Sequence, residues 1–439
     1  MLTLAAPPSK SVSHRVFIAA ALAGGTSLLH HALDSTDIAR TREVLRNAGA
    51  VMEDLGESWR VHGMAGGPNG GTPHAPMDAF MGESGTTCRL LTAVLAAGKG
   101  VFRIHGAPRM HERPLGALAD ALASLGVRFT FAQKPGFAPM LMETEGLGGG
   151  DVELCIDESS QYLSGLLFAA PLGRKPLRVS IVGRKAVSWP YIGLTLQALE
   201  DFGIRFLVES RTAGGWQAVP WKSLAYAEPG KLRITVFPGA YRAGSYSVEG
   251  DWTSASYLLA AGAAGQAPVR VTGLRVDSVQ GDKAMLDILR AMGASVDVRT
   301  DGIIVSPSPL RGIDIDMDAC PDLVPTVAML AAFAQGATHI KNVAHVRLKE
   351  CDRLEACAAQ LALAGVRAET TEDSLTVFGL GPALPRVPVG TVFPAWNDHR
   401  MAMSAALFGL VPGNAVAVDE PQVVRKSFPD FWKVWSALA

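Results

Sequence analysis

The sequence is poor in cysteine, in charge of either sign and in long apolar runs, and each shortage excludes a class of protein. Its five cysteines show no CxxC spacing, which speaks against a metal site and favours a reducing compartment over a disulfide framework. Forty basic and 41 acidic residues give a formal net charge of −1, which argues against general nucleic-acid binding. Apolar runs such as Leu166–Leu172 are too short to span a bilayer. Without a signal-peptide pattern at its start, the sequence predicts a cytoplasmic protein.

Several catalytic signatures are also missing. The sequence contains no GxxxxGK[ST] phosphate-binding loop, no HExxH zinc motif and no GxSxG nucleophile elbow. Neither nucleotide hydrolysis nor metal catalysis is therefore indicated, and we expect no metal and no cofactor.

One pattern recurs six times: an Ala-rich run, a glycine and a short run typical of a β-strand. In five copies a Leu-x-x-apolar-Gly-apolar phrase follows, and we expect its glycine to end a helix in a left-handed conformation before a strand. A repeat this long is a whole supersecondary unit, so the sequence predicts an α/β fold of six related units. The phrases are Leu45–Ala50, Leu122–Val127, Leu199–Ile204, Leu289–Ala294 and Leu361–Val366.

The six copies divide into three before and three after about residue 248, which predicts two similar domains. The segment Leu207–Gly244 interrupts the pattern and is rich in Gly, Pro and Trp. We expect it to form a strand pair with an extended loop that closes the first domain.

Residues suited to a helix N-cap stand just before each Ala-rich run. A helix N-terminus has unbonded N–H groups and carries a partial positive charge of about half a unit, so it readily accepts an anion. Several of these starts also carry Arg or Lys. Together they suggest a cleft built for anionic ligands. The starts begin at Ser9, Gly82, Ser159, Gly250, Cys320 and Asn397.

Four charged segments carry most of the candidate chemistry. They are Lys10–Arg15, Arg109–Pro114, Lys349–Arg353, and Asn397–Arg400 together with Lys426. Ser11 and Arg15 are four residues apart and share a helix face. Lys349 and Arg353 are predicted to share another, with Glu350 between cations, where a carboxylate keeps its charge and can exchange protons with a ligand. Each segment taken alone is also compatible with an ordinary helix cap or a surface ion pair.

Together the segments resemble the motifs of the 5-enolpyruvylshikimate-3-phosphate synthase family, in the family's order over essentially the whole chain. The resemblance implies two domains of three βαβαββ-type repeats each, in an inside-out α/β arrangement with the active site in the interdomain cleft. The first domain would span residues 10–248, on the shikimate 3-phosphate side, and the second residues 1–9 with 249–439. The matching segments are Pro8–Arg15, Gly85–Arg89, Arg109–Pro114, Ser159–Gln161, Glu249–Asp251, Lys349–Leu354, Asn397–Met403 and Lys426–Phe431.

The resemblance also implies a reaction. The family transfers the enolpyruvyl group of phosphoenolpyruvate to the 5-hydroxyl of shikimate 3-phosphate by addition and elimination, releasing phosphate on the route to chorismate and the aromatic amino acids. Its members are mostly monomers, so we expect a monomer whose partners are these two small molecules, with no nucleic acid and no membrane.

Residue roles follow from the same motifs. Asp322 would accept the hydroxyl proton, and Glu350, assisted by Lys10, would move a proton to and from the methylene carbon of phosphoenolpyruvate. The phosphoenolpyruvate contacts would be Lys10, Gly85, Arg113, Gln161, Arg353, Arg400 and Lys426. The shikimate 3-phosphate contacts would be Ser11, Arg15, Ser159, Ser160, Gln161, Ser188, Tyr191, Asp322 and Lys349.

Three positions depart from the family pattern, and two alternative functions stay open. Glu83, His14 and His345 stand where many members carry Asn. A sister enzyme that acts on UDP-N-acetylglucosamine shares the fold, but its characteristic Cys is missing from Gly106–Pro114. A non-catalytic anion-binding protein is the other alternative. Glu83 gives it some weight, whereas carboxylates such as Asp322 and Glu350 next to bound anions speak against it.

Overall fold

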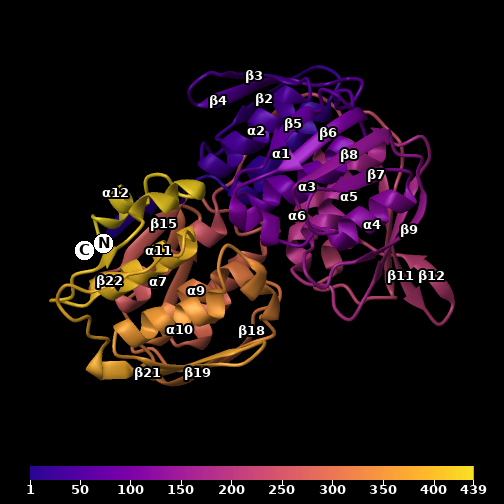
Figure 1. Cartoon of the computed structure of the whole chain (residues 1–439). Helices are drawn as coiled ribbons and strands as arrows, with labels where there is room; N and C mark the ends of the chain where they lie inside the picture. The colour runs from indigo at the N-terminus through magenta and orange to yellow at the C-terminus, as the bar shows by residue number, and fades with distance from the viewer. Residues whose placement is uncertain (439) are drawn as a thin grey trace. The chain divides into compact units, whose positions relative to one another are not determined.

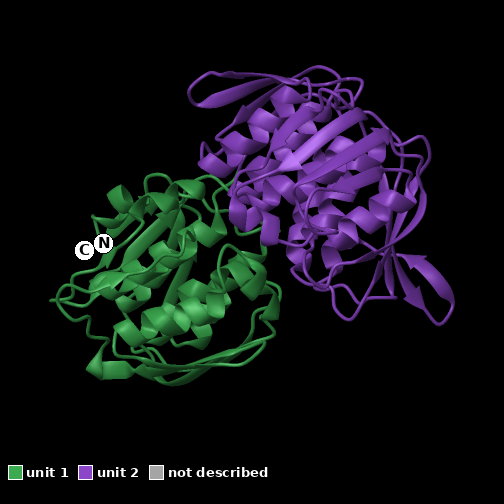
Figure 2. Ribbon diagram, in the orientation of Figure 1, with its two compact units in different colours: residues 1–9, 249–439 green, residues 10–248 purple. Residues whose placement is uncertain are grey.

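The computed structural model describes residues 1–438, and the chain divides into two compact units. Unit 2 is Lys10–Val248, and unit 1 combines Met1–Ser9 with Glu249–Ala439 (Figure 2). Each unit has its own hydrophobic core, so each buries apolar side chains independently. No helix within the described residues is both long and apolar enough to cross a membrane.

The second repeat of unit 2 shows the plan of the fold most simply. Two parallel strands flank a helix, a second helix follows, and an antiparallel pair completes the sheet in the order β5-β6-β8-β7 (Figure 1). The elements are β5 (Met77–Phe80), α3 (Gly85–Ala96), β6 (Lys99–His105), α4 (Gly116–Ser124), β7 (Arg128–Phe131) and β8 (Met140–Glu145).

The other repeats of unit 2 vary this plan. The first has α1 (Lys10–Leu22), β2 (Thr26–His30), α2 (Thr36–Asn47), β3 (Val51–Asp54) and β4 (Ser58–His62), and it takes its leading strand β14 (Ser245–Ser247) from the end of the unit. The third has β9 (Gly150–Cys155), α5 (Gln161–Ala169), β10 (Leu177–Val182), α6 (Trp189–Asp201), β11 (Phe206–Thr212), β12 (Gly215–Ala218) and β13 (Leu232–Val236). The strand pair expected within Leu207–Gly244 is β11 with β12. Strand β13 lies between β11 and β10, as β8 lies between β7 and β6, so β12 is the strand that this repeat adds to the plan.

Unit 1 repeats the same order. Its first sheet takes β1 (Leu2–Ala5) from the N-terminus and continues with α7 (Trp252–Ala264), β15 (Val269–Thr272), α8 (Met285–Ala291), β16 (Ser295–Arg299) and β17 (Gly302–Ser306). The next contains β18 (Asp314–Asp316), α9 (Val324–Ala331), β19 (Gln335–Lys341), α10 (Arg353–Leu363), β20 (Arg367–Thr370) and β21 (Leu375–Leu380). The last contains β22 (Val392–Phe393), α11 (His399–Ala405) and β23 (Ala417–Val418), and α12 (Phe431–Trp435) follows. Its two-stranded sheet corresponds to the copy that lacks the second phrase.

The five repeat glycines end helices as the sequence predicts. Each lies two residues beyond the last residue of α2, α4, α6, α8 or α10, and a strand follows. Their backbones are left-handed, a conformation that glycine adopts at no steric cost. The φ angles are 119° at Gly49, 97° at Gly126, 76° at Gly203, 92° at Gly293 and 73° at Gly365.

The Ala-rich helices lie inside the units and begin at the predicted polar residues. In α7 all but one of the 13 residues are buried, because small side chains let neighbouring elements approach from several sides. Ser84 caps α3 by accepting from the backbone N–H of Thr87, and Asp251 caps α7 by accepting from Ser254. Polar groups on these helices therefore gather at their first turns.

We expect the left-handed backbone at Gly126, and not a steric clash, to determine how much a side chain at this position destabilises the protein. A Cβ added at Gly126 meets no atom within 4 Å, so Gly126→Ala should lose about 1–2 kcal/mol of unfolding free energy through backbone strain alone. Gly148 has equally open space and no left-handed φ, which makes Gly148→Ala the matched control. Urea unfolding followed by circular dichroism measures both, and equal midpoints for the two variants would contradict the assignment.

Candidate functional site

Arg15 is a buried cation in α1 whose guanidinium is held by neutral oxygens. Its Nε donates to Thr195 Oγ1 at 3.0 Å, its Nη1 to the carbonyl of Ser11 at 2.9 Å and its Nη2 to the carbonyl of Tyr191 at 2.7 Å. No carboxylate among residues 1–438 forms an ion pair with it, and burial lowers its pKa to about 10. A buried charge without a counter-ion is costly, so the surroundings of Arg15 are suited to an anionic ligand.

Ser188 and the Ser159–Ser160 pair stand at neighbouring helix starts. Ser188 precedes α6 with a left-handed φ of 56°, a strained conformation for a residue with a side chain, and its carbonyl accepts from Tyr191 N–H at 3.1 Å. Ser159 Oγ accepts from the N–H of Gln161, the first residue of α5, at 3.2 Å. We call Ser11, Arg15, Ser188, Tyr191 and Thr195 the Arg15 site.

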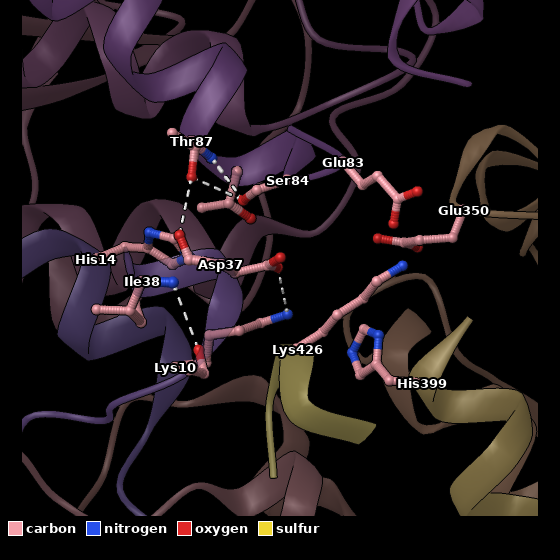
Figure 3. A network of polar contacts seen from close by, with 12 residues as sticks. Lys10, His14, Asp37, Ile38, Glu83, Ser84, Thr87, Glu350, His399 and Lys426 are labelled. Carbon is pink, nitrogen blue, oxygen red and sulfur yellow. Dashed lines mark hydrogen bonds and ion pairs between the residues drawn. The ribbon is translucent and has the colours of Figure 1, made fainter. Parts of the chain in front are cut away.

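The Lys10 site comprises Lys10, Asp37, Ser84, Gly85 and Arg113. Lys10 is the first residue of α1, and its Nζ lies 3.3 Å from Asp37 Oδ2 in the first turn of α2 (Figure 3). Arg113 is buried, and its Nη1 donates to the carbonyl of Glu83 at 3.4 Å. The guanidinium packs so closely on Gly85 that an added Cβ would lie 2.5 Å from Nη2. Two cations therefore lie near the capped start of α3.

A ring of hydrogen bonds joins the helix starts of unit 2. It passes from α1 to α6, α5, α3 and α2 and returns to α1. Of the predicted residues of this unit, Arg15 and Gln161 are links in it, and Gln161 Oε1 also accepts from Arg89 Nη1 at 3.1 Å. The links are Arg15–Thr195 at 3.0 Å, Thr195–Ser164 at 2.9 Å, Gln161–Thr86 at 2.8 Å, Thr87–Thr41 at 2.8 Å and Thr41–His14 at 2.8 Å.

In unit 1, one guanidinium binds three carboxylates. Arg353 is 1% exposed at its side chain, and its Nη1 donates to Asp322 Oδ1 at 2.9 Å, its Nη2 to Glu350 Oε2 at 2.9 Å and its Nε to Asp398 Oδ2 at 2.7 Å. Burial by itself would lower the pKa of Arg353, but the charges of Asp398, Glu350 and Asp322 raise it well above its ordinary value. Asp322 and Glu350 are thus fixed by the same rigid fork.

Two further cations complete what we call the Arg353 cluster. Arg400 Nη2 donates to Asp322 Oδ2 at 2.8 Å, and Lys349 Nζ lies 4.0 Å from Asp322 Oδ1. The cluster is therefore balanced between three cations and three carboxylates. Its members are Asp322, Lys349, Glu350, Arg353, Asp398 and Arg400.

The prediction that Lys349 and Arg353 share a helix face is wrong. Helix α10 begins at Arg353, whereas Lys349 follows a 3-10 turn that spans Ala344–Leu348. Asp352 between them is the N-cap, because its Oδ1 accepts from the N–H groups of Leu354 and Glu355. The two cations approach Asp322 from consecutive elements rather than from one helix.

Lys426 supports the turn that leads into α11. Its Nζ donates to the carbonyl of Asn397 at 2.6 Å and to Asn397 Oδ1 at 3.0 Å. Trp396 and Asn397 both have left-handed backbones, with φ of 48° and 54°, and such strain persists only where neighbouring contacts hold it. Asp398 then caps α11 by accepting from the N–H of Arg400 at 2.9 Å. Lys426 thereby helps to set the position of Arg400.

Three carboxylates in or near these sites are not among the predicted site residues. Asp37 belongs to the Lys10 site, Asp398 belongs to the Arg353 cluster, and Asp282 is close enough to Asp322 to be affected by its charge. Asp398 lies in the matching segment Asn397–Met403, and Asp37 follows a Ser-Thr pair at a helix start. The sequence around both residues could therefore have indicated a functional carboxylate. Asp282 has no such signal in the sequence around it. It is 2% exposed and accepts from Thr253 Oγ1, and burial, followed by the charge of Asp322, raises its pKa to about 7.

Known proteins resemble this chain over nearly its whole length. A family model described as EPSP synthase (3-phosphoshikimate 1-carboxyvinyltransferase) matches residues 2–435. Two proteins named 3-phosphoshikimate 1-carboxyvinyltransferase, from Thiobacillus denitrificans and Shewanella halifaxensis, are 39% and 37% identical, and each alignment covers 100% of this chain and 96% of the relative.

Solved structures share its fold. An EPSP synthase structure from Acinetobacter baumannii gives a TM-score of 0.77 at 24% identity, over 100% of this chain and 95% of that one. The enolpyruvyl transferase NikO from Streptomyces tendae gives 0.73 at 19% identity, over 100% and 94%. The predicted α/β fold class is therefore confirmed.

We expect Asp282→Asn to stabilise the protein increasingly as the pH rises. A carboxyl whose pKa is about 7 when folded, against an ordinary 3.8, is ionised in the unfolded chain between those pH values and must take up a proton on folding. Its stability cost is therefore absent below about pH 4, grows by roughly 1.4 kcal/mol per pH unit and is complete above about pH 7. Asparagine avoids that cost and keeps an oxygen for Thr253.

Chemical unfolding at several pH values between 4 and 8 measures this difference. Asp120 is exposed on α4, so Asp120→Asn is the matched control and should differ from the wild type by a constant amount. A constant difference for Asp282→Asn would show that its carboxyl ionises normally.

Proposed function

Because the chain belongs to the EPSP synthase family of 3-phosphoshikimate 1-carboxyvinyltransferases, we propose that the Arg15 site and the Lys10 site hold its anionic substrates and that the Arg353 cluster carries the proton transfers. The predicted family and its enolpyruvyl transfer are confirmed by the comparisons. The residue roles below are our assignment.

Shikimate 3-phosphate is assigned to the Arg15 site. Its phosphate would supply the negative charge that Arg15 lacks within its own surroundings, and charge-assisted hydrogen bonds to phosphate are stronger than neutral ones. The hydroxyls of Ser11, Ser159 and Ser160 and the residues Ser188 and Tyr191 would orient the sugar-like ring. Gln161, which bridges α5 and α3, lies in the same ring of hydrogen bonds and would contact both substrates.

Phosphoenolpyruvate is assigned to the Lys10 site together with the cations of unit 1. Lys10 and Arg113 near the start of α3 offer two positive charges, and Gly85 adds no side chain of its own at that helix start, where Ser84 already caps the N–H of Thr87. Arg353, Arg400 and Lys426 would complete the neutralisation of its carboxylate and phosphate. We assign all three groups to one reaction, so both units are needed for turnover.

Two carboxylates would move the protons. In the first step the 5-hydroxyl oxygen of shikimate 3-phosphate would bond to C2 of phosphoenolpyruvate, and Asp322 would accept the proton of that hydroxyl. At the same time Glu350 would give a proton to C3. In the second step C3 returns its proton to Glu350, the double bond re-forms and phosphate leaves with the electrons of the C–O bond. Lys10 would assist, and Lys349 would help to hold Asp322 and the acceptor. A group that both donates and accepts must stay accessible to the carbon in both steps.

The pairing of Asp322 and Glu350 on Arg353 is the observation that favours catalysis over simple binding. An anion-binding protein gains nothing from carboxylates placed among its cations, because each one repels the ligand. A reversible acid–base pair requires them. The absence of a Cys from Gly106–Pro114 favours the shikimate acceptor over the UDP-sugar acceptor.

The decisive experiment is phosphate release from phosphoenolpyruvate with each acceptor. Release that depends on shikimate 3-phosphate is the expected result. Release only with UDP-N-acetylglucosamine would identify the sister activity, and tight binding of shikimate 3-phosphate without release would indicate an anion-binding protein.

We further propose that the enzyme is a cytoplasmic monomer. Its five cysteines are all free thiols in the described structure, which suits a reducing compartment. Size-exclusion chromatography with light scattering gives the oligomeric state, and a mass of twice 46.2 kDa would contradict the proposal.

Gly85→Ala should raise the KM for phosphoenolpyruvate more than it lowers turnover. The new Cβ would come within 2.5 Å of the Arg113 guanidinium, so Arg113 must move away from the start of α3. Loss of one charged hydrogen bond is worth about 1.5–3 kcal/mol, or roughly 10- to 100-fold in KM. Steady-state kinetics with phosphate detection measure the change. Gly148→Ala makes the same substitution in open space and should behave as the wild type.

Glu350→Gln should abolish most turnover and spare the binding of shikimate 3-phosphate. Gln keeps an oxygen for Arg353 but has no exchangeable proton, and loss of a general acid–base costs about 10²–10⁴-fold. Single-turnover kinetics and calorimetry measure the two effects. The control is Glu355→Gln, an exposed residue of α10, which should leave turnover intact. A lower melting temperature with near-normal turnover would reduce Glu350 to a structural partner of Arg353.

A further inference from the structure

His14 is a buried residue that the assigned reaction does not use. It lies in α1 with no exposed surface, one turn after Lys10 and next to Arg15. Its Nδ1 lies 2.8 Å from Thr41 Oγ1 in α2, and Thr41 Oγ1 lies 2.8 Å from Thr87 Oγ1 in α3. The side chain therefore starts a polar line that crosses three helices, and Figure 3 shows its two ends, His14 and Thr87.

The far end of the line fixes the direction of every hydrogen bond in it. Thr87 Oγ1 donates to Ser84 Oγ at 2.7 Å and points to the carbonyl of Asp37 at 3.3 Å. A hydroxyl has one proton, so Thr87 must accept from Thr41. Thr41 in turn must accept from His14. The proton of the imidazole is thus assigned to Nδ1, and Nε2 is a bare acceptor.

The imidazole is held neutral by its surroundings. Burial first, and then the positive charges of Lys10 and Arg15, lower the pKa of His14 well below its ordinary value. Its Nε2 has no hydrogen-bond partner among the described residues. A buried acceptor without a partner is unfavourable, so the favourable polar contact of this side chain is the hydrogen bond that its Nδ1 donates.

The line connects the three helices that carry Lys10, Asp37 and Gly85 of the Lys10 site. Lys10 begins α1, the carboxylate of Asp37 that contacts Lys10 lies in the first turn of α2, and Ser84 caps α3 directly before Gly85. Movement of α1 against α2 and α3 would shift Lys10, Asp37 and Gly85 relative to one another. Arg15 instead contacts α6 directly, through Thr195 and the carbonyl of Tyr191.

We propose that His14 is a positioning residue for enolpyruvyl transfer: through Thr41 and Thr87 it holds the first turns of α1, α2 and α3 in the arrangement that binds phosphoenolpyruvate. The inference rests on the proposed function, because it assumes that the Lys10 site receives this substrate. It assigns no chemical step to the imidazole, which donates one hydrogen bond and stays neutral.

The test separates positioning from stability by comparing the two substrates. His14→Phe keeps an aromatic ring and removes the donor, and Thr41→Val removes the next hydroxyl with little change of shape. Each should raise the KM for phosphoenolpyruvate about tenfold, the effect of one lost hydrogen bond, and leave the Kd for shikimate 3-phosphate within about twofold. The double variant should be no worse than the worse single variant, because both break one line.

Two further variants keep the test decisive. His14→Asn carries an amide N–H that can replace the donor, so it should recover part of the lost affinity. Thr92→Val is the matched control, since Thr92 is equally buried in α3 but its hydroxyl donates within its own helix, to the Cys88 carbonyl at 2.7 Å. If His14→Phe does not fold, Thr41→Val and His14→Asn decide the question.

Three results would overturn the inference. An unchanged KM for phosphoenolpyruvate in His14→Phe and Thr41→Val would remove the line from substrate positioning. Equal losses for both substrates, or additive losses in the double variant, would reduce His14 to a general stabilising residue. A wild-type enzyme that releases no phosphate with shikimate 3-phosphate would overturn the proposed function and this inference with it, and the wild-type assay alone distinguishes that case.

Discussion

The Ala-rich helices are buried along nearly their whole length, and this burial restricts where each unit can place polar side chains. A helix covered on all sides has little room for charged side chains beyond its first turns, and its first N–H groups still need partners. In this protein those partners are capping side chains such as Ser84, Asp251 and Asp398. The polar residues of each unit therefore gather at helix starts, where unbonded N–H groups and cations together attract anions.

The two units differ in the partners that they give to their buried arginines. In unit 2, Arg15 is held by carbonyl and hydroxyl oxygens, so a bound anion would supply its counter-charge. In unit 1, Arg353 is bound to three carboxylates and the cluster around it is electrically balanced. The first arrangement suits tight binding of a phosphate. The second keeps carboxylates at fixed positions, which suits proton transfer.

Several residues act through their neighbours and not through a ligand. Lys426 stabilises two consecutive left-handed residues ahead of Arg400, and Asp352 defines where α10 begins and hence where Arg353 lies. The polar line from His14 connects three helices without reaching solvent. A buried hydrogen-bond network of this kind tolerates little substitution, because removing one member leaves another unpaired in a low-dielectric interior.

The six repeats, the helix ends at the five glycines and the polar residues at the helix starts could all be predicted from the amino-acid sequence. These features depend on local chemistry: glycine adopts a left-handed backbone, and short polar side chains satisfy the first N–H groups. The motifs also sufficed for the family, since they occur in its order along the whole chain.

The partners of the buried carboxylates, in contrast, depend on the tertiary fold. Asp37, Asp282 and Asp398 meet their partners across 27, 29 and 45 residues of chain, and no local pattern encodes such separations. The same holds for the shared helix face wrongly expected for Lys349 and Arg353, since spacing alone did not reveal that Asp352 caps the helix between them. Electrostatic partners are set by which helix starts pack together, and that packing is a property of the folded core.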